Sequence, residues 1–146
     1  MATDIDRIYI GWSLSDSSST ERTVMMALRV RSKVWIENDD GKLVIGTGRL
    51  RILEAILELG SMNKAAQKLK QPFRAVWGKI KATEQRCGFK IVERTSEGSR
   101  LTREGLELLD TYGKLTRRCD NFTDQQFNEL FKRLPVRPGI SGEEKA

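Results

Sequence analysis

The feature that most constrains the fold is a stretch in which apolar and basic residues alternate with helical spacing, SMNKAAQKLKQPFRAVWGKIKATEQRCGFKIVER, at residues 61–94. In its first part, apolar residues recur at i, i+3, i+4 and i+7, at Met62, Ala65, Ala66 and Leu69. Two of the four are alanines, and small residues let a second helix cross closely, as a helix-turn-helix requires. The stretch therefore predicts two short helices joined by a tight turn.

The second helix is predicted to follow a turn at residues 70–72 and to end at Cys87, before Gly88. Val76 and Ile80 are four residues apart, so they face the core that the first helix also faces. The other side carries basic and polar residues, namely Arg74, Lys81 and Gln85. A basic helix face directly after such a turn is typical of a recognition helix, which enters the major groove of DNA.

The residues before this stretch predict a β-hairpin and a further helix. Alternating apolar residues between 28 and 45 flank the turn sequence NDDG at 38–41, and Asp-Gly between two such runs is a strong hairpin signal. Residues 49–59 predict a helix, and Ser61 or Asn63 is expected to cap the next one. The inner side of this helix is expected to carry Leu53, Ile56, Leu57 and Gly60.

The residues after it predict a two-stranded wing and C-terminal helices. Residues 89–94 and 101–102 are expected to pair around a turn at 95–100, with Ile91 pointing into the core. A helix is predicted from Arg103, with one apolar face at Leu106, Leu109, Tyr112 and Leu115. The Thr-x-x-Gln pattern at 123–126 has the form of a capping box, which predicts a separate last helix that ends at Pro135.

These elements together predict an α+β, mostly α fold: a winged helix-turn-helix with an N-terminal β-hairpin and C-terminal dimerisation helices. We expect a flexible extension at residues 1–26, the DNA-binding domain at 27–118, a C-terminal helix at 119–134 and a disordered tail at 135–146. The serine-rich run at 13–20 cannot supply a core. The pair Met25-Met26 suggests that the native protein starts there, which would leave residues 1–24 outside it.

The charge distribution favours a polyanionic partner. The formal charge is +6, and residues 61–118 hold 14 Lys/Arg against 6 Asp/Glu, a net +8, so the rest of the chain sums to −2. Nucleic acid is the obvious polyanion, because neutralising its phosphates releases condensed counterions. Charge alone leaves open an acidic membrane surface or a solvated basic face.

The composition argues against an enzyme. The chain contains no histidine, the commonest general base and transition-metal ligand, and its two cysteines, Cys87 and Cys119, form no Cys-x-x-Cys pattern. Without a metal cluster or a phosphate-binding loop no catalytic constellation can be assembled, so we expect no activity, no cofactor and no metal. With no transmembrane run and no signal-peptide h-region, we expect a cytoplasmic protein that does not bind membranes.

Four motifs resemble those of a known family in order and spacing: GSMNKAA at 60–66, FRAVW at 73–77 followed by Ile80, VER at 92–94 and LTREG at 101–105. Residues from about Val30 to Tyr112 resemble the winged helix-turn-helix domain of the bacterial molybdate-responsive regulator ModE, and more distantly that of LysR-type regulators. The resemblance implies a homodimer that binds specific sequences of double-stranded DNA and regulates transcription.

The chain departs from this family in three places. The residues Lys70, Gln71 and Pro72 occupy a turn that usually holds a glycine and a small hydroxyl residue, although proline suits the first position of a helix. The wing is shorter and has Gly98 alone in place of a glycine-rich run. Only about 30 residues follow Tyr112, too few for the molybdate-binding domain, so the sequence does not support metal sensing and leaves open whether molybdate or any other ligand is sensed.

In a DNA complex, four residues at the start of the recognition helix would enter the major groove, namely Gln71, Pro72, Phe73 and Arg74. Arginine can donate twice to guanine, and glutamine can pair with adenine. Trp77 is expected to pack against the hairpin or the wing, and contact with a base or sugar is the alternative.

Phosphate contacts are expected from the recognition helix and from the wing, at Lys81, Arg94 and Arg100. Ser61 and Lys64, at the start of the preceding helix, could add two more. Two alternatives keep the fold: a protein-interaction adaptor, since fold does not fix function, or a non-specific architectural DNA binder.

Overall fold

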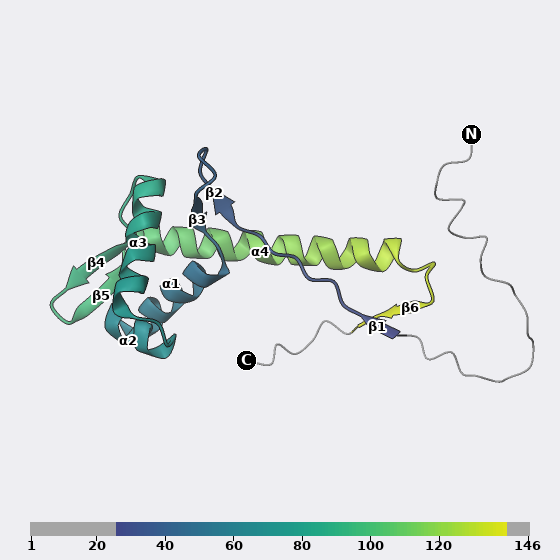
Figure 1. Cartoon of the computed structure of the whole chain (residues 1–146), viewed down its shortest axis with the longest axis horizontal. Helices are drawn as coiled ribbons and strands as arrows, with labels where there is room; N and C mark the ends of the chain where they lie inside the picture. The colour runs from purple at the N-terminus through teal and green to yellow at the C-terminus, as the bar shows by residue number, and fades with distance from the viewer. Residues whose placement is uncertain (1–25, 140–146) are drawn as a thin grey trace, which may run out of the picture.

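The structure is a computed structural model that describes residues 26–139. Its elements, in chain order, are β1 (Met26–Leu28), β2 (Ile36–Glu37), β3 (Leu43–Ile45), α1 (Thr47–Leu59), α2 (Met62–Lys68), α3 (Phe73–Cys87), β4 (Val92–Thr95), β5 (Gly98–Leu101), α4 (Arg103–Leu130) and β6 (Val136–Pro138). The helices α1 to α3 and the β4–β5 hairpin gather at one end of α4, which extends well beyond them (Figure 1). This arrangement confirms the predicted α+β, mostly helical winged helix-turn-helix.

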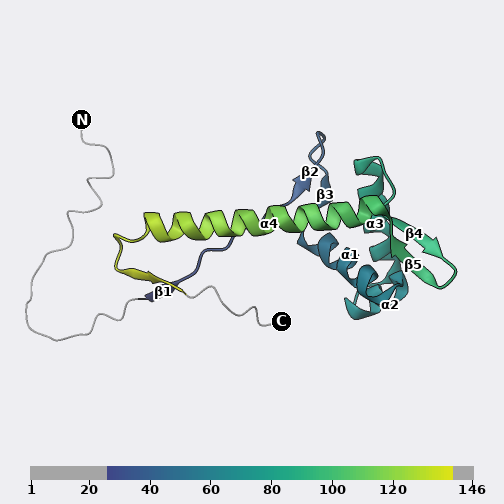
Figure 2. The ribbon, with the colours of Figure 1, turned by 180° about the vertical axis from the view of Figure 1, so that it is seen from behind.

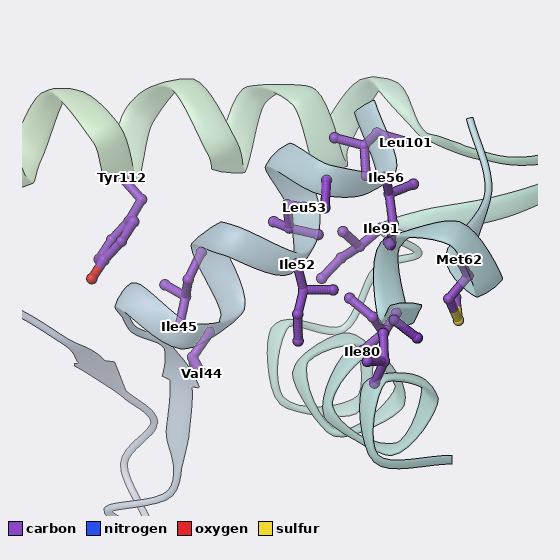
Figure 3. Packing of buried hydrophobic residues seen from close by; sticks show 14 residues of the cluster. Val44, Ile45, Ile52, Leu53, Ile56, Met62, Ile80, Ile91, Leu101 and Tyr112 are labelled. Atoms are coloured by element: carbon purple, nitrogen blue, oxygen red, sulfur yellow. The ribbon is translucent and has the colours of Figure 1, made fainter. Parts of the chain in front are cut away.

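The core lies where α1, α2, α3, the wing and the start of α4 meet (Figure 3). On α1 the buried residues are Ile52, Leu53, Ala55 and Ile56. The prediction for Leu57 is wrong, because its side chain is 54 % exposed. Since α1 packs against α2 on one side and α4 on another, its buried stripe is centred between Ile52 and Ile56. Gly60 is also misplaced, because it is the exposed, left-handed C-cap of α1.

The turn between α2 and α3 forms the predicted helix-turn-helix corner. Val76 and Ile80 are buried, as predicted. Pro72 was expected to be the first helical residue but is the N-cap of α3, which begins at Phe73. Lys70 adopts a φ of 52°, in the left-handed region that normally favours glycine. The turn therefore has the backbone of a glycine turn without the glycine, which explains how the unusual residues at 70–72 are accommodated.

The wing is the antiparallel hairpin of β4 and β5, in which Val92 pairs with Leu101 and Thr95 pairs with Gly98. Its first strand starts at residue 92, later than predicted, while Ile91 is fully buried as expected. Gly98 has a φ of 155°, and a Cβ there would overlap the carbonyl group of Gly60. The amide of Ser99 donates to that carbonyl at 2.9 Å. Glycine at position 98 therefore lets the wing dock on the corner between α1 and α2.

The C-terminal region is one continuous helix of 28 residues, so the prediction of a separate last helix is wrong. Thr123 lies inside α4, where its hydroxyl donates to the carbonyl of Cys119 at 2.8 Å. The Thr-x-x-Gln pattern thus does not cap a helix, because the threonine is satisfied within the preceding turn. Helix α4 ends at Leu130, before Pro135. Of the described helices, none is long and apolar enough to cross a membrane.

Residues 29–35, which we call the strap, run back along α4 from the β2–β3 hairpin (Figures 1 and 2). The Tyr112 hydroxyl donates to the carbonyl of Val34 at 2.7 Å, and Ser32 donates to Asp120. At its far end β1 pairs in parallel with β6, with Met26 opposite Val136. The prediction of a disordered tail is therefore wrong for residues 136–138.

The extended run predicted between residues 28 and 36 forms strands only at its two ends, because no strand among residues 26–139 pairs with the strap between them. The hairpin at the NDDG turn is present, although β2 is only two residues long. The expected N-terminal extension and the proposed start at Met25-Met26 lie, apart from Met26, outside the described residues.

Candidate nucleic-acid interface

The side of α3 that faces away from the core is exposed next to the wing. Val76, Ile80 and Glu84 face inward, while Arg74 and Gln85 are exposed on the outer side. At the edge of this surface, towards the wing, α3 also carries two half-exposed aromatic residues, Phe73 and Trp77. Helix α3 therefore presents cationic, amide and aromatic groups along one surface, which is the chemistry that contacts base edges and phosphates.

A shallow cavity of about 290 Å³ separates this part of α3 from the wing and from the start of α2. Four of the predicted DNA-contacting residues line it, namely Ser61, Phe73, Lys81 and Arg94. Lys64, Gln71, Pro72, Arg74 and Arg100 do not. The predicted set thus divides into residues around this cavity and residues on the surrounding surface.

The start of α2 carries two of the predicted contacts. The side chain of Ser61 accepts a hydrogen bond from the backbone amide of Lys64 at 3.3 Å, so Ser61 is the N-cap. The Lys64 side chain is exposed. Ser61 therefore has a structural role already, and Lys64 is the more available of the two for a phosphate.

The residues at the start of α3 are unequally available. The Oε1 atom of Gln71 accepts a hydrogen bond from Lys79 Nζ at 2.7 Å, which occupies one of the groups that would pair with adenine. Arg74 is exposed and takes part in no ion pair among the described residues. Arg74 is accordingly the freer of the two for base recognition.

Lys81 is held by Glu84, which follows it by three residues on α3, a spacing that brings two side chains together on a helix surface. Its Nζ lies 2.8 Å from an oxygen of Glu84, and this hydrogen bond raises the pKa of Lys81. Glu84 also accepts from the backbone amides of Ile91 at 2.9 Å and Val92 at 3.2 Å. Burial by itself would raise the pKa of Glu84, but the hydrogen bonds from Lys81 and from these amides outweigh it and lower the pKa. Glu84 thus ties the base of the wing to α3.

The two arginines of the wing differ in the same way. Arg100 donates from Nε to Glu93 at 2.7 Å across the hairpin, where Glu93 and Arg100 are paired residues. Both side chains are well exposed, so this ion pair contributes little stability, about 0–1 kcal/mol, and is easily broken. Arg94, opposite Ser99, is exposed and forms no ion pair within the described part of the chain.

Asn63 and Ser99 also line the cavity, although the sequence analysis marked neither of them as a DNA contact. Asn63 lies two residues after the capping Ser61, and Ser99 is on the second strand of the wing, so their proximity is evident only once the wing is folded against α2. The described residues hold no group of His, Cys, Asp and Glu that could bind a metal ion.

Comparisons with known proteins agree with this geometry. Residues 47–106 match the sequence profile described as "Bacterial regulatory helix-turn-helix protein, lysR family". This segment, from α1 into the start of α4, is thus similar in sequence to the helix-turn-helix of LysR-family regulators. None of the comparisons singles out the molybdate-responsive family. No curated protein matches the chain.

Among solved structures, the DNA-binding domain of CbnR in complex with DNA is 22 % identical, with a TM-score of 0.50, over 59 % of this chain and 99 % of that one. Full-length CbnR with its target DNA is 23 % identical, with a TM-score of 0.49, and the matched region is 29 % of that chain. The BenM DNA-binding domain with benA site 1 DNA is 27 % identical over 56 % of this chain and 95 % of that one, with a TM-score of 0.47. The first likeness shows a shared fold.

Proposed function

We propose that the protein is a bacterial transcriptional regulator that binds specific sequences of double-stranded DNA as a homodimer, with α3 in the major groove. We further propose that it is a cytoplasmic binding protein without catalytic activity. The observation that carries the proposal is the exposed cationic and aromatic face of α3 beside the wing, within a segment that matches the LysR-type profile. The CbnR DNA-binding domain, which shares this fold, was solved in complex with DNA, and this supports the same partner here.

Support for the homodimer comes from α4. Leu108, Leu115 and Phe122 recur every seven residues, the spacing with which helices pair in coiled coils. Leu108 packs partly against the core, whereas Leu115 and Phe122 are exposed. A second α4 would bury these side chains, and a two-fold symmetric pair would place two α3 helices on successive turns of the duplex, about 34 Å apart.

The test of DNA binding begins with selection of preferred duplexes from a random library by the full chain. Fluorescence anisotropy then compares the selected duplex with a scrambled one at two salt concentrations. We expect the selected duplex to bind at least about 10³-fold more tightly, as specific complexes do. Equal affinity for both duplexes would identify an architectural binder, and no affinity for either would favour a protein-interaction adaptor.

Two variants test the assignment of roles within the interface. Arg74→Ala should cost about 1–3 kcal/mol on the selected duplex and little on the scrambled one, because a bidentate base contact carries sequence information. Arg100→Ala should weaken binding to both duplexes. It should also reduce the slope of the logarithm of the binding constant against the logarithm of salt concentration by about one. An equal loss on all DNA for Arg74→Ala would make it a phosphate contact instead.

A further inference from the structure

Two aromatic residues of α3, on the side towards the wing, are only partly buried in the fold. Phe73 and Trp77 are four residues apart and therefore lie one turn apart on the same side of the helix. Their exposed fractions are 42 % and 49 %, and both line the cavity between α3 and the wing. Single exposed apolar residues are ordinary, but adjacent large ones mark a contact surface. We call this pair the aromatic step.

The surroundings of the aromatic step are cationic. Arg74 follows Phe73 in the sequence, Lys81 Nζ lies 5.9 Å from the centre of the Trp77 ring, and Arg94 lines the same cavity. A partner that fits must therefore present negative charge and an apolar group side by side. Duplex DNA does so in its major groove, where the 5-methyl group of thymine projects between two rows of phosphates.

The residue beside Trp77 also favours a close partner. Gly78 is exposed in the interior of α3, and a Cβ at this position would meet no atom within 4 Å. Glycine weakens a helix interior, and the described fold does not need the space that it leaves. Its absent side chain allows the edge of a groove to approach the backbone of α3 next to the aromatic step.

We propose that Phe73 and Trp77 determine sequence specificity by contacting the 5-methyl groups of thymines in each half-site. This inference rests on the proposed function and names the base that this part of α3 recognises. Arg74 and the aromatic step then read different features of the groove: Arg74 the hydrogen-bond acceptors of a purine, and the aromatic pair the apolar methyl groups.

The experiment replaces each thymine of the selected duplex, one at a time, with deoxyuridine, which differs only in lacking the methyl group. Anisotropy with the full chain should show positions where this change weakens binding by about fourfold, the effect of burying one methyl-sized group. The same duplexes are then titrated with Phe73→Ala and Trp77→Ala. At the contacted positions, the thymine and deoxyuridine duplexes should bind the relevant variant equally, because coupling appears only between groups in contact.

The matched control is Trp35→Ala. Trp35 is 52 % exposed but belongs to the strap, so this variant should keep the full sensitivity to deoxyuridine. Circular dichroism checks that all three variants are folded, and we expect that they are because each removed side chain is about half exposed.

Three results would overturn the inference. Insensitivity of the wild-type protein to every deoxyuridine would mean that the aromatic step contacts the sugar or only the wing. Unchanged sensitivity in both Phe73→Ala and Trp77→Ala would assign the methyl contact to other residues. Either of these two results would overturn the inference but leave specific binding, and hence the proposed function, intact. If no duplex is preferred over the scrambled one, the proposed function fails, and this inference fails with it.

Discussion

The two ends of α4 lie in very different surroundings. Around its first three turns, the winged domain buries a cluster of 14 hydrophobic residues, all between Val44 and Tyr112. Beyond Tyr112, α4 is flanked by the strap and the β1–β6 pair, and no described residue there is fully buried. The first region has a core of its own, whereas the second exposes apolar side chains for which a second chain would be the natural cover. The comparison separates residues that stabilise the fold from residues available for assembly.

The largest effect is expected in the core. Ile56→Ala removes a fully buried side chain between α1 and the rest of the domain, and should lower the free energy of unfolding by about 2–5 kcal/mol. Urea denaturation followed by circular dichroism measures it. Leu57→Ala is the control, because this neighbour on the same helix is exposed and should cost well under 1 kcal/mol. Equal losses for both variants would mean that the buried face of α1 is assigned wrongly.

The next effect concerns the polar tie between α3 and the wing. Glu84→Gln should cost about 1.5–3 kcal/mol, because hydrogen bonds to a charged group with little exposure are lost or weakened. Glu58→Gln is the control, since its ion pair with Lys68 is well exposed and contributes only about 0–1 kcal/mol.

The destabilisation caused by Glu84→Gln should depend on pH. Because the pKa of Glu84 is lowered in the folded state, its contribution is complete above the pKa of the unfolded chain and is lost as pH falls through the folded pKa. The difference in unfolding free energy between wild type and Glu84→Gln should therefore be full at neutral pH and shrink in acid. A difference that stays constant down to the acid transition would argue against a charged Glu84.

A smaller effect is expected where the two regions join. Tyr112→Phe keeps the buried ring but removes the hydroxyl that donates to the carbonyl of Val34. The cost should be about 1 kcal/mol. Hydrogen exchange should show faster opening of the strap with little change in α1. Unaltered exchange in the strap would mean that this bond does not anchor it.

The smallest effect on stability, and the largest on assembly, is expected at Phe122. This side chain is 64 % exposed, so Phe122→Ser should change the unfolding free energy of one chain by less than about 0.5 kcal/mol. Sedimentation at micromolar concentration should nevertheless shift from a dimer to the 16.6 kDa monomer. A wild-type protein that sediments only as the monomer would refute the homodimer directly.

The elements of the winged domain could be predicted because their signals are local. The apolar spacing of α2 and α3, the capping Ser61 and the stop at Gly88 depend on residues within one or two helical turns. The two wrong predictions, a helix start at Thr123 and a buried Leu57, have a common cause: a local sequence pattern does not show what surrounds a residue in the fold. The Thr-x-x-Gln pattern at 123–126 is equally local, yet a continuous helix satisfies Thr123 just as well. Leu57 was wrongly predicted to be buried, because the buried face of α1 is set by the three helices that pack against it, α2, α3 and α4.

For the candidate interface, the sequence by itself determined the residue types: a basic, aromatic face on the second helix of a helix-turn-helix, with further cations on a wing. Their spacing along one helix fixes that face, since the backbone repeats every 3.6 residues. Only the tertiary structure decided which of these groups are available. Lys81 and Arg100 meet Glu84 and Glu93, whereas Arg74 and Arg94 stay exposed, and the wing leaves half of Trp77 uncovered. For Lys81 the partner is three residues away on the same helix, so helical spacing alone allows that pair. For Arg100 and Trp77, availability depends on what the folded wing brings alongside, and the periodicity of a single helix carries no information about that.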